Sequence, residues 1–275
     1  MKRFIYILLI PVAAWLVLFV ISDVFRLQDN AVFNPSMPIG AFLDNLGEPL
    51  QKHTVKTARG NEIAVWTTGG DAKKPIIILS HGRSAHERTL LPLIKILRAD
   101  NNIVILYSYS GYPPSTGRPS EKNTYDDLAA VINFAKTDFN AGKENIILAG
   151  HSLGAAVAID AAARDNFKAV IALVPFSSIK DFQRYNSRRR VLLRVLRLLP
   201  VKHRFDSASK VGKITSPFYL FYSQEDDITP SFMPRRLLAN NKNIVAFSYE
   251  RGNHKDVSWY AADLAAVIKK LNQTR

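Results

Sequence analysis

Cysteine is absent from the 275 residues of this sequence. Disulfide bonds, thiolate metal sites and cysteine nucleophiles are therefore excluded. The absence does not identify a cellular compartment, because an oxidising compartment permits disulfide bonds without requiring them. The sequence also lacks internal repeats and low-complexity tracts, and 47% of its residues are apolar. This composition is typical of one large core, or of one domain with a small insertion.

Acidic residues are scarce relative to basic ones. The chain has 23 Asp and Glu against 37 Lys and Arg, which gives a formal net charge of +14. Such an excess indicates a nucleic acid, an anionic membrane or an acidic substrate as a partner, or a basic surface with no dedicated partner. The position of the charges along the chain has to separate these alternatives.

The N-terminal residues form a long apolar run. Lys2 and Arg3 precede residues 4–21, which contain no charged side chain. A helix of that length, at about 1.5 Å per residue, reaches roughly 27 Å and nearly spans a hydrocarbon core of about 30 Å. A cleaved secretory signal has a shorter core and ends at a small-x-small site, which residues 19–25 lack.

We therefore expect an uncleaved, single-helix membrane anchor, with a cleaved signal as the alternative and a buried core helix as a third interpretation. The first two both place the following domain on the exported side, periplasmic or luminal and extracellular, because the positive charges precede the apolar run. The expected organisation is an anchor at 1–25, a tether without strong periodicity at 26–50, and a catalytic domain at 51–275.

Strand and helix patterns alternate from residue 53 onward. Short apolar or β-branched runs predict strands at 53–57, 63–68, 76–79, 103–109, 146–149, 169–174, 218–222 and 245–249. Helices are expected between them, at about 87–99, 124–137, 152–164, 232–240 and 256–271. This order predicts an α/β fold with a mostly parallel sheet and helices on both faces.

The segment Gly150-His151-Ser152-Leu153-Gly154 has the G-x-S-x-G pattern. An apolar strand precedes it and an alanine-rich helix follows it, which is the setting that this motif requires. A nucleophilic serine must occupy a sharp turn whose glycines avoid a collision, and the helix N-terminus favours a developing negative charge. The pattern therefore identifies Ser152 as a candidate nucleophile, and a purely structural turn is the alternative.

A serine nucleophile needs a base and an acid further along the chain, in the order Ser, acid, His. The histidines that follow Ser152 are His203 and His254. His254 lies in a loop between the last strand and the last helix, where a base can reach the nucleophile. His203 lies in a basic stretch and is expected to be a surface residue.

The acid is expected after the strand at 218–222, because a carboxylate must orient the imidazole and stabilise its cation. Three carboxylates compete there: Glu225, Asp226 and Asp227. Their spacing does not choose between Asp226 and Asp227. For the oxyanion hole we expect two backbone N–H groups, one from Leu153 and one from Arg83 in the loop after residues 76–79. In the same loop, His81 is expected to be structural.

These motifs resemble those of the α/β-hydrolase family, and more narrowly those of Bem46-related and ABHD-type membrane-anchored serine hydrolases. The resemblance covers roughly residues 53–270. It rests on the elbow at 150–154, the His81-Gly82 loop, the tyrosine- and glycine-rich segment at 109–121, and the short motif at 205–207.

In that family the acid stands four residues before a proline. Pro230 therefore implies Asp226 as the acid. Ser223 is a departure, because the family usually has His-Gly before the acid loop. The resemblance further implies hydrolysis of acyl esters or thioesters, and it implies no cofactor.

A basic insertion is expected at about 176–212, where this fold carries its lid. Between Arg184 and Arg204 it holds eight basic residues with no acid among them: Arg184, Arg188, Arg189, Arg190, Arg194, Arg197, Lys202 and Arg204. Apolar residues alternate with them, which is typical of an amphipathic helix that rests on anionic lipid. A lid helix with solvated arginines is the alternative. Nucleic acid is disfavoured, because no aromatic interleaving and no recognised binding motif accompany the arginines.

The sequence thus favours an exported, membrane-anchored serine hydrolase of small acyl esters or lipid-like substrates. A serine peptidase on the same fold is one alternative. The other is an inactive relic that binds lipid or protein, which the complete set of Ser152, Asp226 and His254 argues against.

Overall fold

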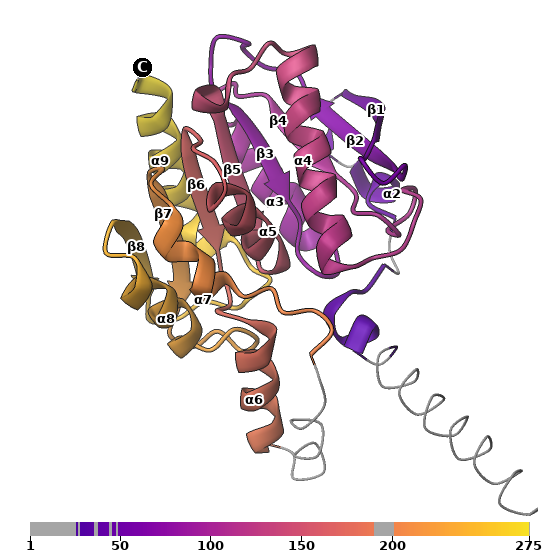
Figure 1. Cartoon of the computed structure of the whole chain (residues 1–275). Coiled ribbons are helices and arrows are strands. Elements are labelled where there is room, and N and C mark those ends of the chain that lie inside the picture. The colour runs from indigo at the N-terminus through magenta and orange to yellow at the C-terminus, as the bar shows by residue number, and fades with distance from the viewer. Residues whose placement is uncertain are drawn as a thin grey trace, which may run out of the picture.

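One mixed sheet organises the chain in the computed structural model, which describes residues 26, 28–35, 38–43, 46–47, 49–189 and 201–274 (Figure 1). Its eight strands are β1 (Leu50–Lys56), β2 (Glu62–Thr68), β3 (Ile76–Ser80), β4 (Val104–Tyr107), β5 (Ile146–His151), β6 (Ala169–Leu173), β7 (Phe218–Ser223) and β8 (Ile244–Tyr249). The order across the sheet is β1-β2-β4-β3-β5-β6-β7-β8. β2 pairs antiparallel with β1 and β4, and the strands from β4 to β8 are parallel.

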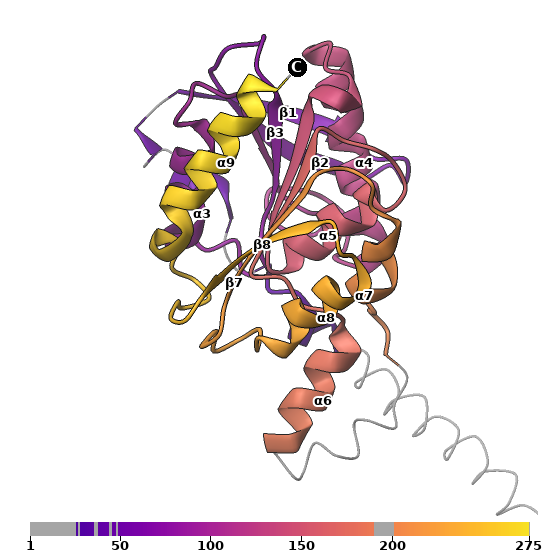
Figure 2. The ribbon, with the colours of Figure 1, turned by 90° about the vertical axis from the view of Figure 1, so that its left-hand side faces the viewer.

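The helices between the strands provide the crossovers that parallel pairing needs. They are α3 (Glu87–Arg98), α4 (Glu121–Asp138), α5 (Leu153–Ala162), α6 (Ile179–Arg189), α7 (Ser207–Lys210), α8 (Phe232–Asn240) and α9 (Ala261–Gln273), and a short α2 (Gly40–Leu43) precedes the sheet. α3 and α9 cover one face, and α4 and α5 cover the other (Figures 1 and 2). This arrangement confirms the predicted fold.

The two faces of the sheet support two hydrophobic cores. Side chains alternate along a strand, so Ile76 and Ile78 of β3 enter the core beneath α4 and α5, whereas Ile77 and Leu79 enter the core beneath α3 and α9. Because both faces are covered, every residue of β3 is buried. The central strands therefore form a rigid base for the loops that leave them.

The register of the strands brings several strand ends to one edge of the sheet. Ser80 at the end of β3 lies opposite Gly150 of β5, and His151 lies opposite Leu173 at the end of β6. In open α/β sheets ligands bind outside the carboxyl ends of the strands. The loops after β3, β5, β7 and β8 leave from this edge, and they contain the predicted site residues.

The segment predicted as a tether packs against the body of the protein where it is described. Phe33, Ile39, Phe42 and Leu43 are each at most 4% exposed. Phe33 joins one core, and the other three join the core that contains Trp66. The segment has little regular structure, so its burial left no periodic signal in the sequence.

Element boundaries differ from the predicted ones by a few residues. α4 begins at Glu121 rather than 124, because the hydroxyl of Ser120 accepts a hydrogen bond from the Asn123 N–H and caps the helix. Among the described residues, no helix combines the length and the apolar character that a bilayer crossing needs. The predicted membrane segment at 4–21 lies outside the described residues, as do residues 190–200 of the basic insertion.

Candidate active site

Ser152 occupies the sharp turn between β5 and α5. Its backbone has φ 54° and ψ −109°, a conformation that costs a non-glycine residue on the order of 1–3 kcal/mol. The Ser152 N–H donates to the carbonyl of Leu173 at 2.9 Å, which ties the turn to β6. A strained, partly exposed serine at a strand-to-helix turn is the geometry of a nucleophile elbow.

The two glycines of the motif allow this turn by their lack of a side chain. A Cβ on Gly150 would lie 2.2 Å from the Gly154 carbonyl oxygen, and one on Gly154 would lie 1.9 Å from the Ser80 carbonyl oxygen. Both distances are far inside van der Waals contact with backbone atoms. The turn therefore requires glycine at both positions, as the motif predicts.

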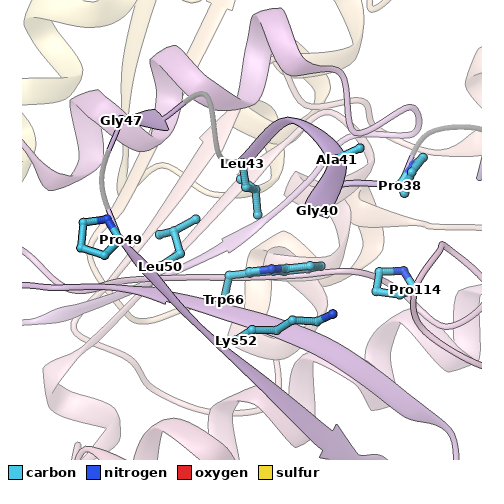
Figure 3. A pocket seen from close by; sticks show the side chains of 10 residues that line it. All are labelled: Pro38, Gly40, Ala41, Leu43, Gly47, Pro49, Leu50, Lys52, Trp66 and Pro114. Atoms are coloured by element: carbon cyan, nitrogen blue, oxygen red, sulfur yellow. The ribbon is translucent and has the colours of Figure 1, made fainter.

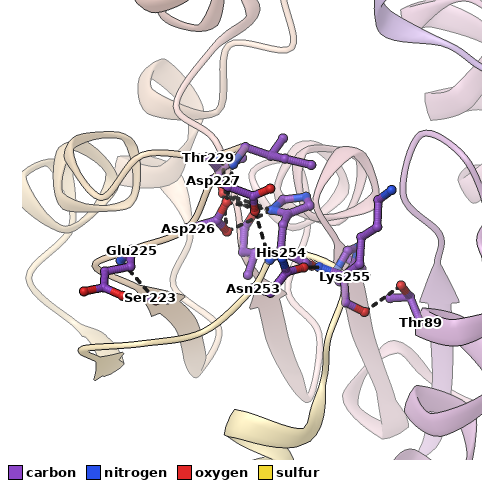
Figure 4. Close-up of polar contacts among 12 residues, drawn as sticks. Thr89, Ser223, Glu225, Asp226, Asp227, Thr229, Asn253, His254 and Lys255 are labelled. Carbon is purple, nitrogen blue, oxygen red and sulfur yellow. Dashed lines mark hydrogen bonds and ion pairs between the residues drawn. The ribbon is translucent and has the colours of Figure 1, made fainter.

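His254 and Asp226 meet in the loops that follow β8 and β7 (Figure 4). The His254 Nδ1 lies 2.8 Å from Oδ2 and 3.1 Å from Oδ1 of Asp226. Both side chains are buried. Since an ionised carboxylate only accepts hydrogen bonds, Nδ1 is the donor and Nε2 keeps its lone pair. This is the tautomer in which imidazole can accept a proton at Nε2.

Asp226 is stabilised as an anion by its own turn. Its carboxylate accepts hydrogen bonds from the Ile228 N–H at 2.8 Å, the Thr229 N–H at 2.7 Å and the Thr229 hydroxyl at 2.9 Å. Burial raises the pKa of Asp226, but the hydrogen bond and charge of His254 and these N–H groups outweigh it. The pKa therefore lies below its usual value.

The neighbouring carboxylates take other positions. Glu225 and Asp227 are exposed. The Asp227 carboxylate accepts a long hydrogen bond from the backbone N–H of His254, at 3.4 Å. The structure thus brings Asp226, rather than either neighbour, to the imidazole.

His151 connects the elbow to the loop of His254, which the sequence did not indicate. The His151 Nε2 donates to the backbone carbonyl of His254 at 3.0 Å, and the two rings lie 5.3 Å apart. Burial, followed by the charge of His254, lowers the pKa of His151 to about 3. The residue next to Ser152 is therefore a neutral donor that holds His254. Its place beside the serine in the motif was the only signal for this contact.

The loop after β3 packs against the elbow. A Cβ on Gly82 would lie 3.0 Å from Nδ1 of His151 and 3.6 Å from Cβ of Ser152. Glycine at this position therefore lets the backbone of residues 81–83 approach the serine closely. This approach is what an oxyanion loop requires.

The two predicted oxyanion donors are placed by the backbone around them. The carbonyl of Gly82 accepts from the Ala85 N–H at 3.1 Å and from Nδ1 of His81 at 2.7 Å. In a trans peptide the C=O and N–H point in opposite directions, so the Arg83 N–H points away from these partners. Leu153 is the first residue of α5, where an N–H has no partner within the helix.

His81 is fully buried beneath this loop, and its ring lies 4.0 Å from that of Tyr109. Burial lowers its pKa to about 4, so the imidazole is neutral near pH 7. Its Nδ1 proton is donated to the Gly82 carbonyl. These contacts agree with the structural role that we expected.

His203 is buried, with 3% of its surface exposed, and the prediction of a surface residue was wrong. Its Nε2 donates to Asp29 at 2.7 Å, its Nδ1 accepts from the Glu121 N–H at 3.3 Å, and its ring meets that of Phe33 at 5.0 Å. The N-terminal segment that covers His203 contains Asp29, which is 174 positions away in the sequence. The residues next to His203 in the sequence therefore give no sign that it is buried.

A separate hollow of about 830 Å³ lies beside β1 and β2, near Trp66, Lys52 and Pro38 (Figure 3). These strands form the opposite end of the sheet from β7 and β8. No predicted site residue lines this hollow. In the part of the chain that the structure describes, no three His, Asp or Glu side chains gather in a way that could hold a metal ion.

Comparison with known proteins agrees with the sheet order and the elbow, which together are those of an α/β hydrolase. The family described as serine aminopeptidase, S33, matches residues 71–210. The α/β hydrolase domain-containing protein 17B of Xenopus tropicalis is 31% identical over 221 residues, which cover 79% of this chain and 74% of that protein. Human protein 17B is 28% identical with the same coverage. The chain therefore belongs to the α/β-hydrolase superfamily.

Solved structures show the same fold at low sequence identity. An esterase of Pyrococcus furiosus superposes with a TM-score of 0.69 at 14% identity, over 83% of this chain and 92% of that one. A thioesterase domain from the curacin biosynthetic pathway gives a TM-score of 0.56 at 14% identity, over 81% of this chain and 100% of that domain.

Another relative by sequence, the human α/β hydrolase domain-containing protein 17C, is matched over only 50% of its length, at 31% identity and over 63% of this chain.

Proposed function

We propose that this α/β hydrolase is a serine hydrolase that cleaves carboxylic esters or thioesters of small acyl or lipid-like substrates. The observation that supports it most is the pair formed by His254 and Asp226, whose loop is joined by the hydrogen bond from His151 to the His254 carbonyl to the residue directly before the strained Ser152. The neighbouring folds with esterase and thioesterase in their names support the same class of reaction.

The proposed reaction proceeds through an acyl-enzyme. The Ser152 hydroxyl oxygen attacks the acyl carbon while Nε2 of His254 takes its proton, and Asp226 stabilises the imidazolium. The N–H groups of Arg83 and Leu153 bind the oxyanion. The tetrahedral intermediate expels an alcohol or thiol, which receives the proton from His254. Water then cleaves the acyl-enzyme by the same steps and restores the serine.

Replacing Ser152 tests this proposal. In a panel of p-nitrophenyl esters of graded chain length, acyl thioesters and peptide p-nitroanilides, Ser152→Ala should lower kcat on the order of 10⁶-fold. Ser248→Ala is the matched control, because Ser248 is exposed on β8 and should leave the rates unchanged. Activity that survives Ser152→Ala would refute the assignment.

The panel also separates the alternatives. The description of the matching family supports a peptidase as the alternative. A peptidase would cleave the anilides faster than the esters. An inactive relic would cleave nothing at a rate that depends on Ser152. We expect esters or thioesters to give the highest kcat/KM.

We also propose that residues 4–21 anchor the protein in a membrane, with the catalytic domain on the exported side. Lys2 and Arg3 before an uncharged run support this orientation. Protease protection in spheroplasts or sealed vesicles should find the domain outside the cytoplasm and the protein at its full mass. A soluble protein shorter by about twenty residues would indicate a cleaved signal peptide instead.

The basic insertion is the second proposed membrane contact. Lys202 is partly neutralised by Asp29, at 2.6 Å, so the arginines supply most of the proposed attraction. Replacing Arg188, Arg189 and Arg190 with Gln should weaken salt-sensitive binding of a form lacking residues 1–25 to anionic vesicles, by about 1 kcal/mol per charge. A triple Gln variant at the exposed lysines Lys242, Lys269 and Lys270 is the control. Equal binding of both variants would leave the arginines as a solvated face of the lid.

A further inference from the structure

The oxyanion loop is supported from behind by two buried tyrosines. The Tyr109 hydroxyl donates to the carbonyl of His81 at 2.8 Å, and the Tyr112 hydroxyl donates to the carbonyl of Arg83 at 2.8 Å. Both tyrosines have no exposed surface. Since the Gly82 carbonyl is also bonded, three consecutive peptide units of this loop are each held by a hydrogen bond. The direction of the Arg83 N–H is therefore fixed by contacts outside the elbow.

The Tyr112 hydroxyl has a second partner in the N-terminal segment at residues 28–34. It accepts a hydrogen bond from the Asn34 N–H at 3.0 Å, across 78 positions of sequence. The same segment receives the Arg83 guanidinium, which donates to the Asn30 carbonyl at 2.6 Å. The Asn34 side chain reaches Ser84 at 3.4 Å. The N-terminal segment thus meets the oxyanion loop directly at Arg83 and Ser84, and indirectly through Tyr112.

The N-terminal segment is itself fixed to the C-terminal part of the basic insertion. Phe33 is buried against the rings of His203 and Phe205, at 5.0 and 6.0 Å. Asp29 binds Lys202 and His203 at 2.6 and 2.7 Å. Residues 28–34 therefore connect two parts of the molecule, the base of the insertion and the oxyanion loop.

We propose that Tyr112 is a positioning residue of the oxyanion hole, and that through it residues 28–34 set the position of the Arg83 N–H. This inference rests on the proposed function. It gives the segment after the predicted anchor a role in the rate of hydrolysis, in addition to attachment. Oxyanion donors act at about 2.7–3.1 Å from the developing charge. A small displacement of the loop therefore reduces the stabilisation of the transition state more than it reduces the binding of the substrate.

Tyr112 suits this role because its hydroxyl keeps its proton. Burial raises the pKa of Tyr112 well above its ordinary value. The hydroxyl can therefore donate to Arg83 and accept from Asn34 at the same time over any working pH. Phenylalanine would keep the ring and remove both hydrogen bonds.

Tyr112→Phe in the full chain should lower kcat about 10-fold and leave KM within about 2-fold, since a tenfold change corresponds to about 1.4 kcal/mol of transition-state stabilisation. The affinity for a boronic acid that mimics the tetrahedral intermediate should fall in proportion to kcat/KM. Tyr260→Phe is the matched control. Tyr260 is equally buried but lies just before α9, in the core on the other face of the sheet, and among the described residues its hydroxyl has no hydrogen-bond partner, so kcat should not change.

A second pair of variants separates the backbone link from the side chain. Asn34→Pro removes the N–H that Tyr112 accepts from, whereas Asn34→Ala keeps it. Only the proline variant should lose kcat, and adding Tyr112→Phe to it should cause little further loss, because both changes break the same link.

Three results would overturn the inference while the proposed function stands: an unchanged kcat in Tyr112→Phe, an equal loss in Tyr260→Phe, or a Tyr112→Phe loss confined to KM. Ser152→Ala is assayed in parallel. Activity that persists in Ser152→Ala refutes the proposed function itself, and the inference with it. The Tyr112 result decides the inference even where Asn34→Pro does not fold.

Discussion

The acid–base side of the candidate site and its oxyanion side are held by contacts of different range. The Asp226 carboxylate is satisfied largely inside its own turn, by Ile228 and Thr229, two and three positions away. The oxyanion loop depends on Tyr109 and Tyr112, which are 28 and 29 positions from the residues that they bind. The turn of Asp226 is therefore a local structure, whereas the loop takes its shape from distant segments.

This difference predicts how the two sides respond to substitution. A change on the acid–base side removes a group that exchanges or stabilises a proton, so its effect should be large and confined to a few residues. A change behind the oxyanion loop moves a backbone donor slightly, so the loss of kcat should be smaller. Substitutions in the N-terminal segment should cause a loss of the same kind.

Asp226→Asn should have the largest effect on the acid–base side. An amide in place of the carboxylate no longer fixes the Nδ1–H tautomer of His254 or stabilises its cation, so kcat/KM should fall on the order of 10⁴-fold. Asp227→Asn is the matched control and should cost less than about 3-fold, because exposed Asp227 meets only the backbone of His254, through a long hydrogen bond of 3.4 Å that the amide oxygen of asparagine can still accept. Comparable losses in the two variants would show that the carboxylates share the role or that Asp227 holds it.

His151 should give an intermediate effect, because it links the two sides. His151→Leu removes the donor to the His254 carbonyl and should lower kcat about 10-fold to 100-fold, since a misplaced catalytic group can cost about 100-fold. His151→Gln supplies an amide N–H of similar reach and should recover most of that loss. If leucine and glutamine at this position behave alike, the hydrogen bond does not position His254.

The smallest effect concerns stability in acid. His151 and His81 have folded pKa values of about 3 and about 4, against 6.5 in the unfolded chain. Between pH 6.5 and 4 the unfolded chain therefore binds protons that the folded chain does not, so these groups lower the free energy of unfolding as pH falls. Each contributes a slope of at most about 1.4 kcal/mol per pH unit. Asp127 acts in the opposite direction, because burial raises its pKa to about 7.

His151→Gln isolates one of these contributions. Urea unfolding at pH 7, 6 and 5 should show that the free energy of unfolding falls more in the parent than in the variant. The difference between the two slopes should not exceed about 1.4 kcal/mol per pH unit, which is the largest contribution of one histidine. A loss that is the same in parent and variant would mean that His151 is not held neutral in the folded protein.

The same contrast explains how much the sequence could predict. The strands, the elbow with Ser152, and His254 as the base follow from periodicity, short motifs and their order along the chain. The choice of Asp226 over Asp227 needed the resemblance to a family, because both carboxylates lie in one turn.

Contacts between distant segments were not predictable. Nothing near His203 in the sequence shows that Asp29 and Phe33 bury it. In the same way, the sequence around Tyr112 shows only a likeness to a family, and its bond to Asn34 spans 78 positions. A glycine after a strand predicts the oxyanion loop itself, but the tyrosines that support the loop are distant in sequence and meet it only in the folded structure.

Labelling with a fluorophosphonate tests the central claim most directly, because the probe phosphonylates only a serine activated as a nucleophile. The parent protein should be labelled on one peptide, the one that contains Ser152, as mapped by mass spectrometry. Labelling should be lost in Ser152→Ala and strongly slowed in Asp226→Asn, while Asp227→Asn and Ser248→Ala should be labelled at the parent rate. A label on another serine, or a Ser152→Ala protein that is still labelled, would contradict the account.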